Sequence, residues 1–143
     1  MLRIYKIISF FLLVSCVVKA QNIDIVFSNI RSVSGQIRVQ IYTDTKNFDD
    51  DKPVKIFKFP KKDIVQGIMV AKINLEPGTY GFALVDDENV NNEMDFNILS
   101  MPKEGFGFSN FYLSGFKRPK FEMFKFILEK NQKLRVNMKI RYL

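Results

Sequence analysis

The sequence predicts an all-β protein, an antiparallel two-sheet sandwich of about seven strands with one long loop excursion. Three observations support this class. Apolar and polar residues alternate with period two along much of the chain, turn-forming residues separate the alternating runs, and no segment has the pattern of an amphipathic helix. Strands with one apolar face bury that face against a second sheet, which makes a sandwich.

The clearest alternation lies near the C-terminus. Within 133–142, the residues Leu134, Val136, Met138, Ile140 and Tyr142 alternate with lysine, arginine and asparagine. Further strands are expected at 23–30, 37–42, 54–59, 69–75, 80–85 and 124–128. The Asn131-Gln132 pair predicts a tight turn that joins the last two strands as a hairpin.

The first twenty residues have the features of a secretory signal peptide. Arg3 and Lys6 precede an apolar run at 7–18, and small residues end the segment at Ala20. We expect cleavage after Ala20, a single domain over 21–143, and export to the periplasm or the extracellular space. The run is shorter than the roughly 20 residues that a membrane-spanning helix needs, so we expect no transmembrane segment after processing. In an alternative interpretation, the residues before Cys16 form a lipobox and the protein is anchored by lipid at Cys16.

The composition excludes several function classes. The chain has 143 residues, a formal net charge of +7, one cysteine and no histidine. Serine and cysteine triads of the usual kind and histidine-ligated zinc are therefore excluded. One cysteine cannot form an internal disulfide, so an apolar core rich in the fifteen phenylalanines must hold the fold. We expect no nucleic-acid partner for an exported protein.

A long excursion over 86–120 interrupts the strand pattern with Asn, Gly and Pro clusters. Loops of this length in compact domains are usually functional or strongly self-packed. Near its start, oxygen-bearing residues recur at alternate positions, as the ligands of calcium do in a turning loop. These candidate calcium ligands are Asp87, Asn89, Asn91 and Asp95, with Glu93 contributing its backbone carbonyl.

Two interpretations of this acidic segment stay open. A helix-loop-helix calcium loop has glycine at position 6 and glutamate at position 12, where this chain has Asn92 and Ile98. A further carboxylate, from Asp86 or Glu104, would have to complete the site. In the second interpretation the segment is an Asx-rich turn, whose side chains cap backbone N–H groups and bind no metal.

The carboxylates of the excursion do not resemble the pair of a glycosidase. The acidic residues from Asp86 to Asp95 are crowded into one polar loop, where we expect solvent to keep all of them ionised. We therefore expect a protein that is not an enzyme. A carboxylate-dependent, glycan-active enzyme is the least favoured alternative.

Two further surfaces have alternative interpretations. Phe106, Phe108 and Phe111 either form a stacking platform for a sugar or another planar ligand, or pack onto the end of the sandwich beside flexible glycines. Basic residues form a stripe on the last hairpin, which either contacts an envelope protein or glycan or is simply solvated; they are Lys125, Lys133, Arg135, Lys139 and Arg141.

Four segments, at 75–80, 86–95, 101–110 and 119–121, resemble in order and spacing the domain of unknown function 2141 family of small secreted bacterial proteins. The most specific is Gly105-Phe106-Gly107-Phe108-Ser109-Asn110. The resemblance implies a transthyretin-like or immunoglobulin-like sandwich and brings no established activity. The family usually has histidine before Asp87 and glycine at position 90 or 92, where this chain has Asp86, Val90 and Asn92.

Together these observations predict an exported, non-enzymatic β-sandwich that acts as a binding module, with calcium as the one candidate cofactor at 87–95. The alternative is a structural protein of the cell envelope that binds no metal and contacts protein or glycan through its exposed strands.

Overall fold

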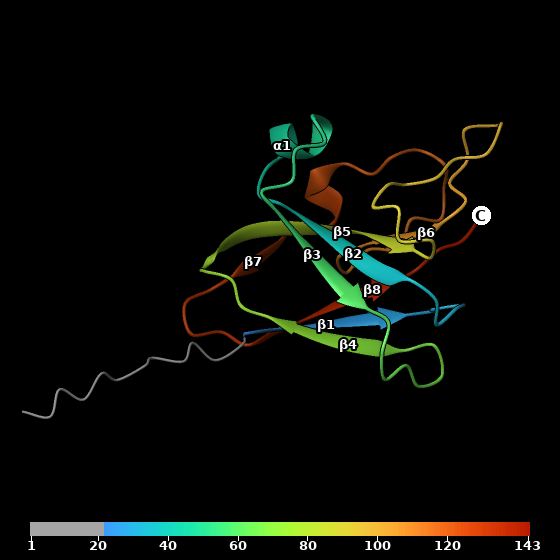
Figure 1. Ribbon diagram of the computed structural model, residues 1–143. Helices are drawn as coiled ribbons and strands as arrows, with labels where there is room; N and C mark the ends of the chain where they lie inside the picture. The colour runs from blue at the N-terminus through green and yellow to red at the C-terminus, as the bar shows by residue number, and fades with distance from the viewer. Residues whose placement is uncertain (1–21) are drawn as a thin grey trace, which may run out of the picture.

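The computed structural model describes residues 22–143, so the predicted signal peptide, its cleavage after Ala20 and the Cys16 alternative lie outside the described residues. Two sheets face each other in this part of the chain (Figure 1), which confirms the predicted all-β sandwich. The strands are β1 (Ile23–Ser28), β2 (Gln36–Tyr42), β3 (Lys55–Pro60), β4 (Met69–Ile73), β5 (Gly78–Asp87), β6 (Gly105–Phe108), β7 (Phe126–Leu128) and β8 (Leu134–Lys139).

The smaller sheet has the order β4-β1-β8, and the larger has the order β3-β2-β5-β6 with β7 paired to one end of β5. One pair departs from the antiparallel prediction, because β1 runs parallel to β8. The predicted hairpin is also wrong. Asn131 does have a left-handed backbone, with φ of 61°, but the turn links β7 of the larger sheet to β8 of the smaller one. The chain crosses between layers at this point, so β8 enters beside β1 in the same direction.

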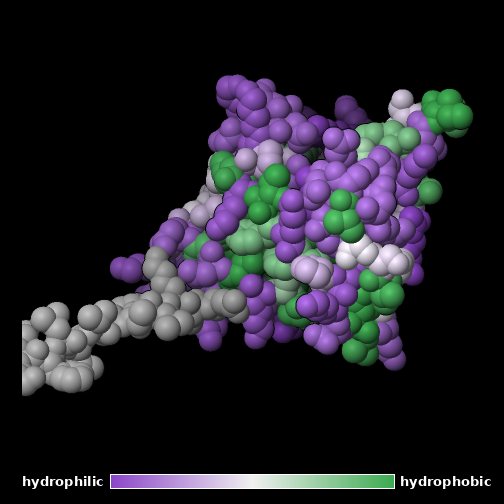
Figure 2. Space-filling view, in the orientation of Figure 1, coloured by the Kyte–Doolittle hydropathy of each residue, from purple (hydrophilic) through white to green (hydrophobic). Residues whose placement is uncertain are grey.

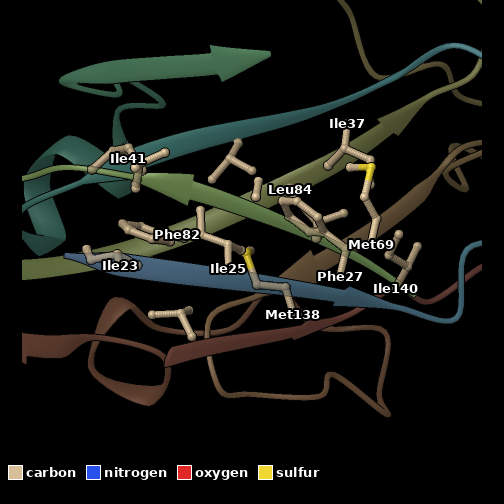
Figure 3. Packing of buried hydrophobic residues seen from close by; sticks show 14 of the residues in the cluster. Ile23, Ile25, Phe27, Ile37, Ile41, Met69, Phe82, Leu84, Met138 and Ile140 are labelled. Carbon is tan, nitrogen blue, oxygen red and sulfur yellow. The ribbon is translucent and has the colours of Figure 1, made fainter. Parts of the chain in front are cut away.

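The core lies between the two sheets, where alternate residues of β1, β2, β4, β5 and β8 point inward (Figure 3). Ile23, Ile25 and Phe27 of β1 are fully buried, as are Val136 and Met138 of β8. The period-two pattern therefore predicts the buried face of these strands correctly. Each such side chain contributes about 1.5–3 kcal/mol when it is withdrawn from water, and the core accordingly needs no disulfide.

The excursion contains one strand, β6, that the alternation does not reveal, because glycines occupy its inward positions. Two short helical segments were also not expected, α1 (Thr45–Asp49) and the 3-10 turn η1 (Phe121–Met123). The Asp44 side chain caps α1 by accepting a hydrogen bond from the Asn47 N–H at 2.8 Å. Among residues 22–143, no helix has the length and apolar character needed to cross a bilayer.

The two sheets differ in what covers their outer faces. The segment with α1, the η1 turn and the excursion lie over the larger sheet, on the side away from the smaller one (Figure 1). The outer face of the smaller sheet carries exposed or half-buried side chains such as Val70 and Lys72. The face seen in Figure 2 is mostly hydrophilic, and an apolar projection marks the tip of the loop between β5 and β6.

Candidate functional site

The outer face of the larger sheet forms the floor of a cleft of about 670 Å³. Arg38 and Gln40 of β2, Val85 and Ala83 of β5 and Phe106 of β6 contribute to this floor. The strand register places them in rows across the sheet, because Arg38 lies opposite Val85, which in turn lies opposite Phe106. The segment around α1, the loop at 92–102 and the segment at 113–119 form the walls.

Arg38 is the unusual residue of the floor. Its position on β2 points it away from the core, where the alternation predicts contact with solvent, yet only 8% of the residue is exposed. The Nε–H is completely buried and makes no hydrogen bond within residues 22–143. A buried donor without a partner costs about 1–3 kcal/mol, and more when it is charged. The fold thus keeps a guanidinium in the cleft without supplying an acceptor for its Nε.

Aromatic side chains form one end of the cleft. Tyr42, Phe48 and Phe108 pack with Phe121 and Phe124 in a second apolar cluster outside the main core. Their rings meet edge to face: Tyr42 and Phe48 have centroids 5.2 Å apart at 83°, and Phe48 and Phe124 are 4.9 Å apart at 71°. Such pairs are favoured beyond their buried area, so this end of the cleft has a rigid apolar wall.

The polar groups at this end are already paired. The Tyr42 hydroxyl donates to the Asp51 carboxylate at 2.8 Å, and burial together with this bond raises the pKa of Tyr42 well above its usual range. Arg118 donates from Nη2 to the Phe48 carbonyl at 2.6 Å and lies over the Phe48 ring, 4.1 Å from its centroid. Arg118 and Asp51 therefore hold the wall together, and neither forms an ion pair within residues 22–143.

Hydrogen bonds from Arg141 stabilise the opposite wall. Arg141 donates from Nη1 to the carbonyls of Leu113 and Gly115, at 2.6 and 2.5 Å. Phe96, Met101 and Phe116 line the cleft here, and Phe96 and Phe116 are also 56% and 79% exposed at its rim. Ile98 and Leu99 form the apolar tip of the loop at 92–102. The mouth of the cleft is therefore apolar.

The candidate calcium residues form a hydrogen-bonded turn next to the cleft. Asp87, the last residue of β5, accepts the N–H groups of Asn91 and Asn92 at 3.1 and 3.0 Å and the Gln36 side chain at 2.8 Å. The amides of Asn89 and Asn91 donate to the Asp95 carboxylate at 2.7 and 2.9 Å. The Glu93 N–H donates to the Asn91 side-chain oxygen at 2.9 Å. In this arrangement the side-chain oxygens act as caps, which is the Asx-turn pattern.

Glu104 lies beside this turn, and sequence reasoning named it as one of two carboxylates able to complete a calcium site. One of its oxygens accepts the Asp95 N–H at 3.4 Å, and the other is buried without a hydrogen bond within residues 22–143. Burial, with the nearby charges of Asp87 and Asp95, raises the pKa of Glu104. In the part of the chain that the structure describes, no three acidic or cysteine side chains are grouped closely enough to hold a metal as they stand.

The expectation that solvent surrounds all the acidic side chains is wrong for Asp86 and Asp87, which are both fully buried at the end of β5. Asp86 points toward the core side, where it is 2.5 Å from the Lys61 ammonium and accepts the Tyr142 hydroxyl at 2.6 Å. Lys61 also donates to the Ser32 carbonyl at 2.9 Å. The sequence gives no sign of this buried pair, because its members lie far apart in the chain.

The segment Gly105-Phe106-Gly107-Phe108 is a strand. A side chain at Gly105 would meet Tyr142 and Ile140 at 2.4 and 2.5 Å, so only glycine allows β6 to approach this closely. Phe108 is buried in the second apolar cluster, and Phe106 and Phe111 pack against it. The packing interpretation therefore describes these rings, although Phe106 and Phe108 also line the cleft.

The backbone at two turn positions agrees with the resemblance noted in the sequence. Val90 and Asn92 have φ of 59° and 64°, in the left-handed region that glycine favours. The resemblance implies glycine at one or the other of these positions. Asn adopts this backbone readily, but a β-branched valine is strained there.

Comparisons with known proteins identify the family. No curated protein and no solved structure matches this chain. The profile of one family, described as an uncharacterized protein conserved in bacteria, matches residues 25–136, which span the sandwich from β1 into β8. With this match over most of its length, the chain belongs to the DUF2141 family.

Proposed function

We propose that this protein is an exported, non-enzymatic binding module, residing in the periplasm or outside the cell, that holds a small ligand in the cleft over its larger sheet. The observation that carries the proposal is the cleft itself, with a volume of about 670 Å³ and walls of aromatic and apolar side chains. Ligand sites in proteins have this size and character. The signal-peptide features of residues 1–20 support export.

The arrangement of the fold also supports binding. The excursion, α1 and η1 cover only the larger sheet, and they leave a hollow above its floor instead of closing onto it. Hydrogen bonds from Arg118 and Arg141 hold the two walls to neighbouring segments. A cleft with fixed walls loses little conformational entropy when a ligand enters.

Binding of the neutral fluorescent dye N-phenyl-1-naphthylamine tests this function. We expect the dye to bind with increased fluorescence, and Gln40→Phe, which places a ring on the cleft floor, to weaken binding at least tenfold. Val70→Phe is the matched control, because Val70 is 52% exposed on the other sheet and lies outside the cleft. Equal dye binding by both variants, or none by the unmodified protein, would refute the proposal.

Calcium binding at 87–95 is a second candidate function, favoured by one observation. Glu104 brings a buried carboxylate oxygen without a hydrogen bond to the side of Asp87 and Asp95. To hold calcium, the amides of Asn89 and Asn91 would turn their oxygens toward the ion in place of the N–H groups that now face Asp95. A comparison of the melting temperature in millimolar calcium and in chelator tests this candidate.

Contact with an envelope protein or glycan through the basic strand β8 has weaker support. The register places Asp24 of β1 between Lys72 of β4 and Arg135 of β8 on the outer face of the smaller sheet. Opposite charges on neighbouring strands compensate one another. The face therefore has mixed charge at this position, which suits a solvated surface better than an anion-binding stripe.

A further inference from the structure

We propose that the ligand of the cleft is a small organic monocarboxylate, whose carboxylate binds the Arg38 guanidinium and whose alkyl or aryl body lies along the apolar walls. This inference rests on the proposed binding function and adds the chemical class of the ligand. The binding function rests on the presence of the cleft. The ligand class rests on a separate observation, the buried Arg38 guanidinium that has no acceptor for its Nε–H.

Arg38 is a buried cation that lines the cleft and lacks a hydrogen-bond acceptor for its Nε–H. The residue is 8% exposed, lines the cleft, and has a buried Nε–H without a hydrogen bond in residues 22–143. No ion pair to its guanidinium occurs in that part of the chain either. A guanidinium presents a planar fork of N–H donors that matches the two oxygens of a carboxylate.

The other charged residues around the cleft favour a single negative charge on the ligand. Arg118 and Asp51 hydrogen-bond to neutral groups, the Phe48 carbonyl and the Tyr42 hydroxyl, so both keep their charge in the lining. Glu93 lines the cleft and forms no ion pair within 22–143, so it would repel an anion. The charged side chains of the lining are two guanidiniums, Arg38 and Arg118, and two carboxylates, Asp51 and Glu93. The lining therefore has no net positive charge that could compensate the second charge of a phosphate dianion. Lys58, opposite Arg38 on β3, adds positive potential from the edge of the sheet.

The rest of the cleft suits an apolar body. Val85 and Phe106 follow Arg38 across the floor, and Met94 and Met101 lie in the wall above. The rim at Phe96 and Phe116 is apolar and exposed, so a chain longer than the cleft would still meet apolar side chains at the mouth. A ligand with one charged end and one apolar end therefore fits the order of these groups from Arg38 outward.

A structural role for Arg38 predicts a different behaviour of the unliganded protein. If Arg38 supports the fold, its replacement lowers the melting temperature. If Arg38 is held for a ligand, Arg38→Met keeps the aliphatic stem, removes an unpaired buried charge, and leaves the melting temperature unchanged or raises it.

The experiment measures displacement of N-phenyl-1-naphthylamine by octanoate, 1-octanol and octyl phosphate from protein purified after expression of the full chain. These probes share one alkyl chain and differ in the head group. We expect octanoate to displace the dye at concentrations at least tenfold lower than either of the others. Arg38→Met should weaken octanoate about 10- to 100-fold and change the affinities for the dye and for octanol by less than about threefold. Arg135→Met, on the exposed face of β8, is the charge-matched control.

Glu93→Gln should tighten octanoate binding severalfold, because it removes a competing negative charge from the cleft. The inference is overturned if Arg38→Met binds octanoate as the unmodified protein does, if octanol or octyl phosphate equals octanoate, or if unliganded Arg38→Met melts at a lower temperature. With dye binding intact, each of these results leaves the binding function standing. Failure of the unmodified protein to bind the dye, with no heat from octanoate in calorimetry, would refute both proposals.

Discussion

The Lys61 ammonium lies 2.5 Å from the Asp86 carboxylate, and neither side chain is exposed to solvent. The Tyr142 hydroxyl donates to the second oxygen of Asp86 at 2.6 Å, and burial with this bond raises the pKa of Tyr142 well above its usual range. The Arg31 guanidinium covers the Tyr142 ring and pairs with Glu88 at 2.7 Å. This network connects the residue after β3, the end of β5 and the residues after β8 at one end of the sandwich.

Removing one member of the buried pair should destabilise the protein strongly. We expect Lys61→Met to lower the free energy of unfolding by about 3–5 kcal/mol, because it leaves the Asp86 charge buried without its cation. The double variant Lys61→Met/Asp86→Leu should recover most of this loss, since both desolvated charges are gone. Urea denaturation of the four proteins in a double-mutant cycle measures the coupling.

The exposed pair Lys46–Asp50 provides the control for that cycle, because its ammonium and carboxylate are also 2.5 Å apart but remain in contact with solvent. Lys46→Met should change the free energy of unfolding by no more than about 0.5 kcal/mol. Similar losses at Lys61 and Lys46 would show that burial does not determine the strength of the Lys61–Asp86 pair.

Glu104 should make stability fall as pH rises. Its pKa is raised in the fold from an ordinary value of 4.5, so the folded state binds this proton more tightly than the unfolded chain. The contribution of Glu104 to stability is therefore greatest below pH 4.5 and decreases until the pH passes the raised pKa. We expect Glu104→Gln in chelator to be more stable than the unmodified protein at pH 7, by about 1 kcal/mol, and equally stable at pH 4. Urea midpoints at both pH values measure this.

Glu129→Gln is the control for Glu104, because Glu129 is exposed in the turn before β8. It should shift the urea midpoint at neither pH. A loss of stability in Glu104→Gln at pH 7 would mean that the Glu104 carboxylate makes a favourable interaction in the fold.

Val90→Gly should stabilise the protein by about 1 kcal/mol. Val90 has φ of 59° and is 53% exposed, so glycine removes backbone strain and loses few contacts. Val33→Gly is the matched control, since Val33 is also exposed but lacks a positive φ and should become less stable through the flexibility of glycine. Thermal melting of both variants decides the point, and a lower melting temperature for Val90→Gly would contradict the strain argument.

The calcium interpretation predicts that millimolar calcium raises the melting temperature relative to chelator by about 2–8 °C. Magnesium should raise it less, because it requires stricter octahedral geometry. Asp95→Asn and Glu104→Gln should each abolish the calcium shift, whereas Glu129→Gln should keep it. Identical melting curves in calcium and in chelator would refute the calcium interpretation, and only the Asx-turn interpretation would remain.

Sequence reasoning performed best where a side chain's surroundings depend on its own strand. The alternation at Leu134–Lys139 assigns Val136 and Met138 to the core, because period two fixes which residues share a face. It failed at Arg38, because the surroundings of this side chain depend on segments that are distant in the sequence. The pattern shows only that Arg38 points away from the core, and its burial comes from segments at 92–102 and 113–119 that fold over the sheet.

The same limit applies to the candidate sites. Asp87, Asn89, Asn91 and Asp95 were recognised because they are close in sequence, and the structure does gather them in one turn. Lys61 and Tyr142 were not recognised as partners of Asp86, since 25 and 56 positions separate them from it. Residues that meet through sheet topology leave no local spacing pattern in a single sequence.

The position of β1 between β4 and β8 has a consequence for how the protein is made. The first strand of the sandwich gains its second neighbour only from residues 134–139, the last strand to be synthesised. Until those residues have been synthesised, one edge of Ile23–Ser28 has no neighbouring strand to hydrogen-bond with. The smaller sheet therefore forms completely only after residues 134–139 are available, and a chain that stops short of Leu134 lacks one side of this sheet.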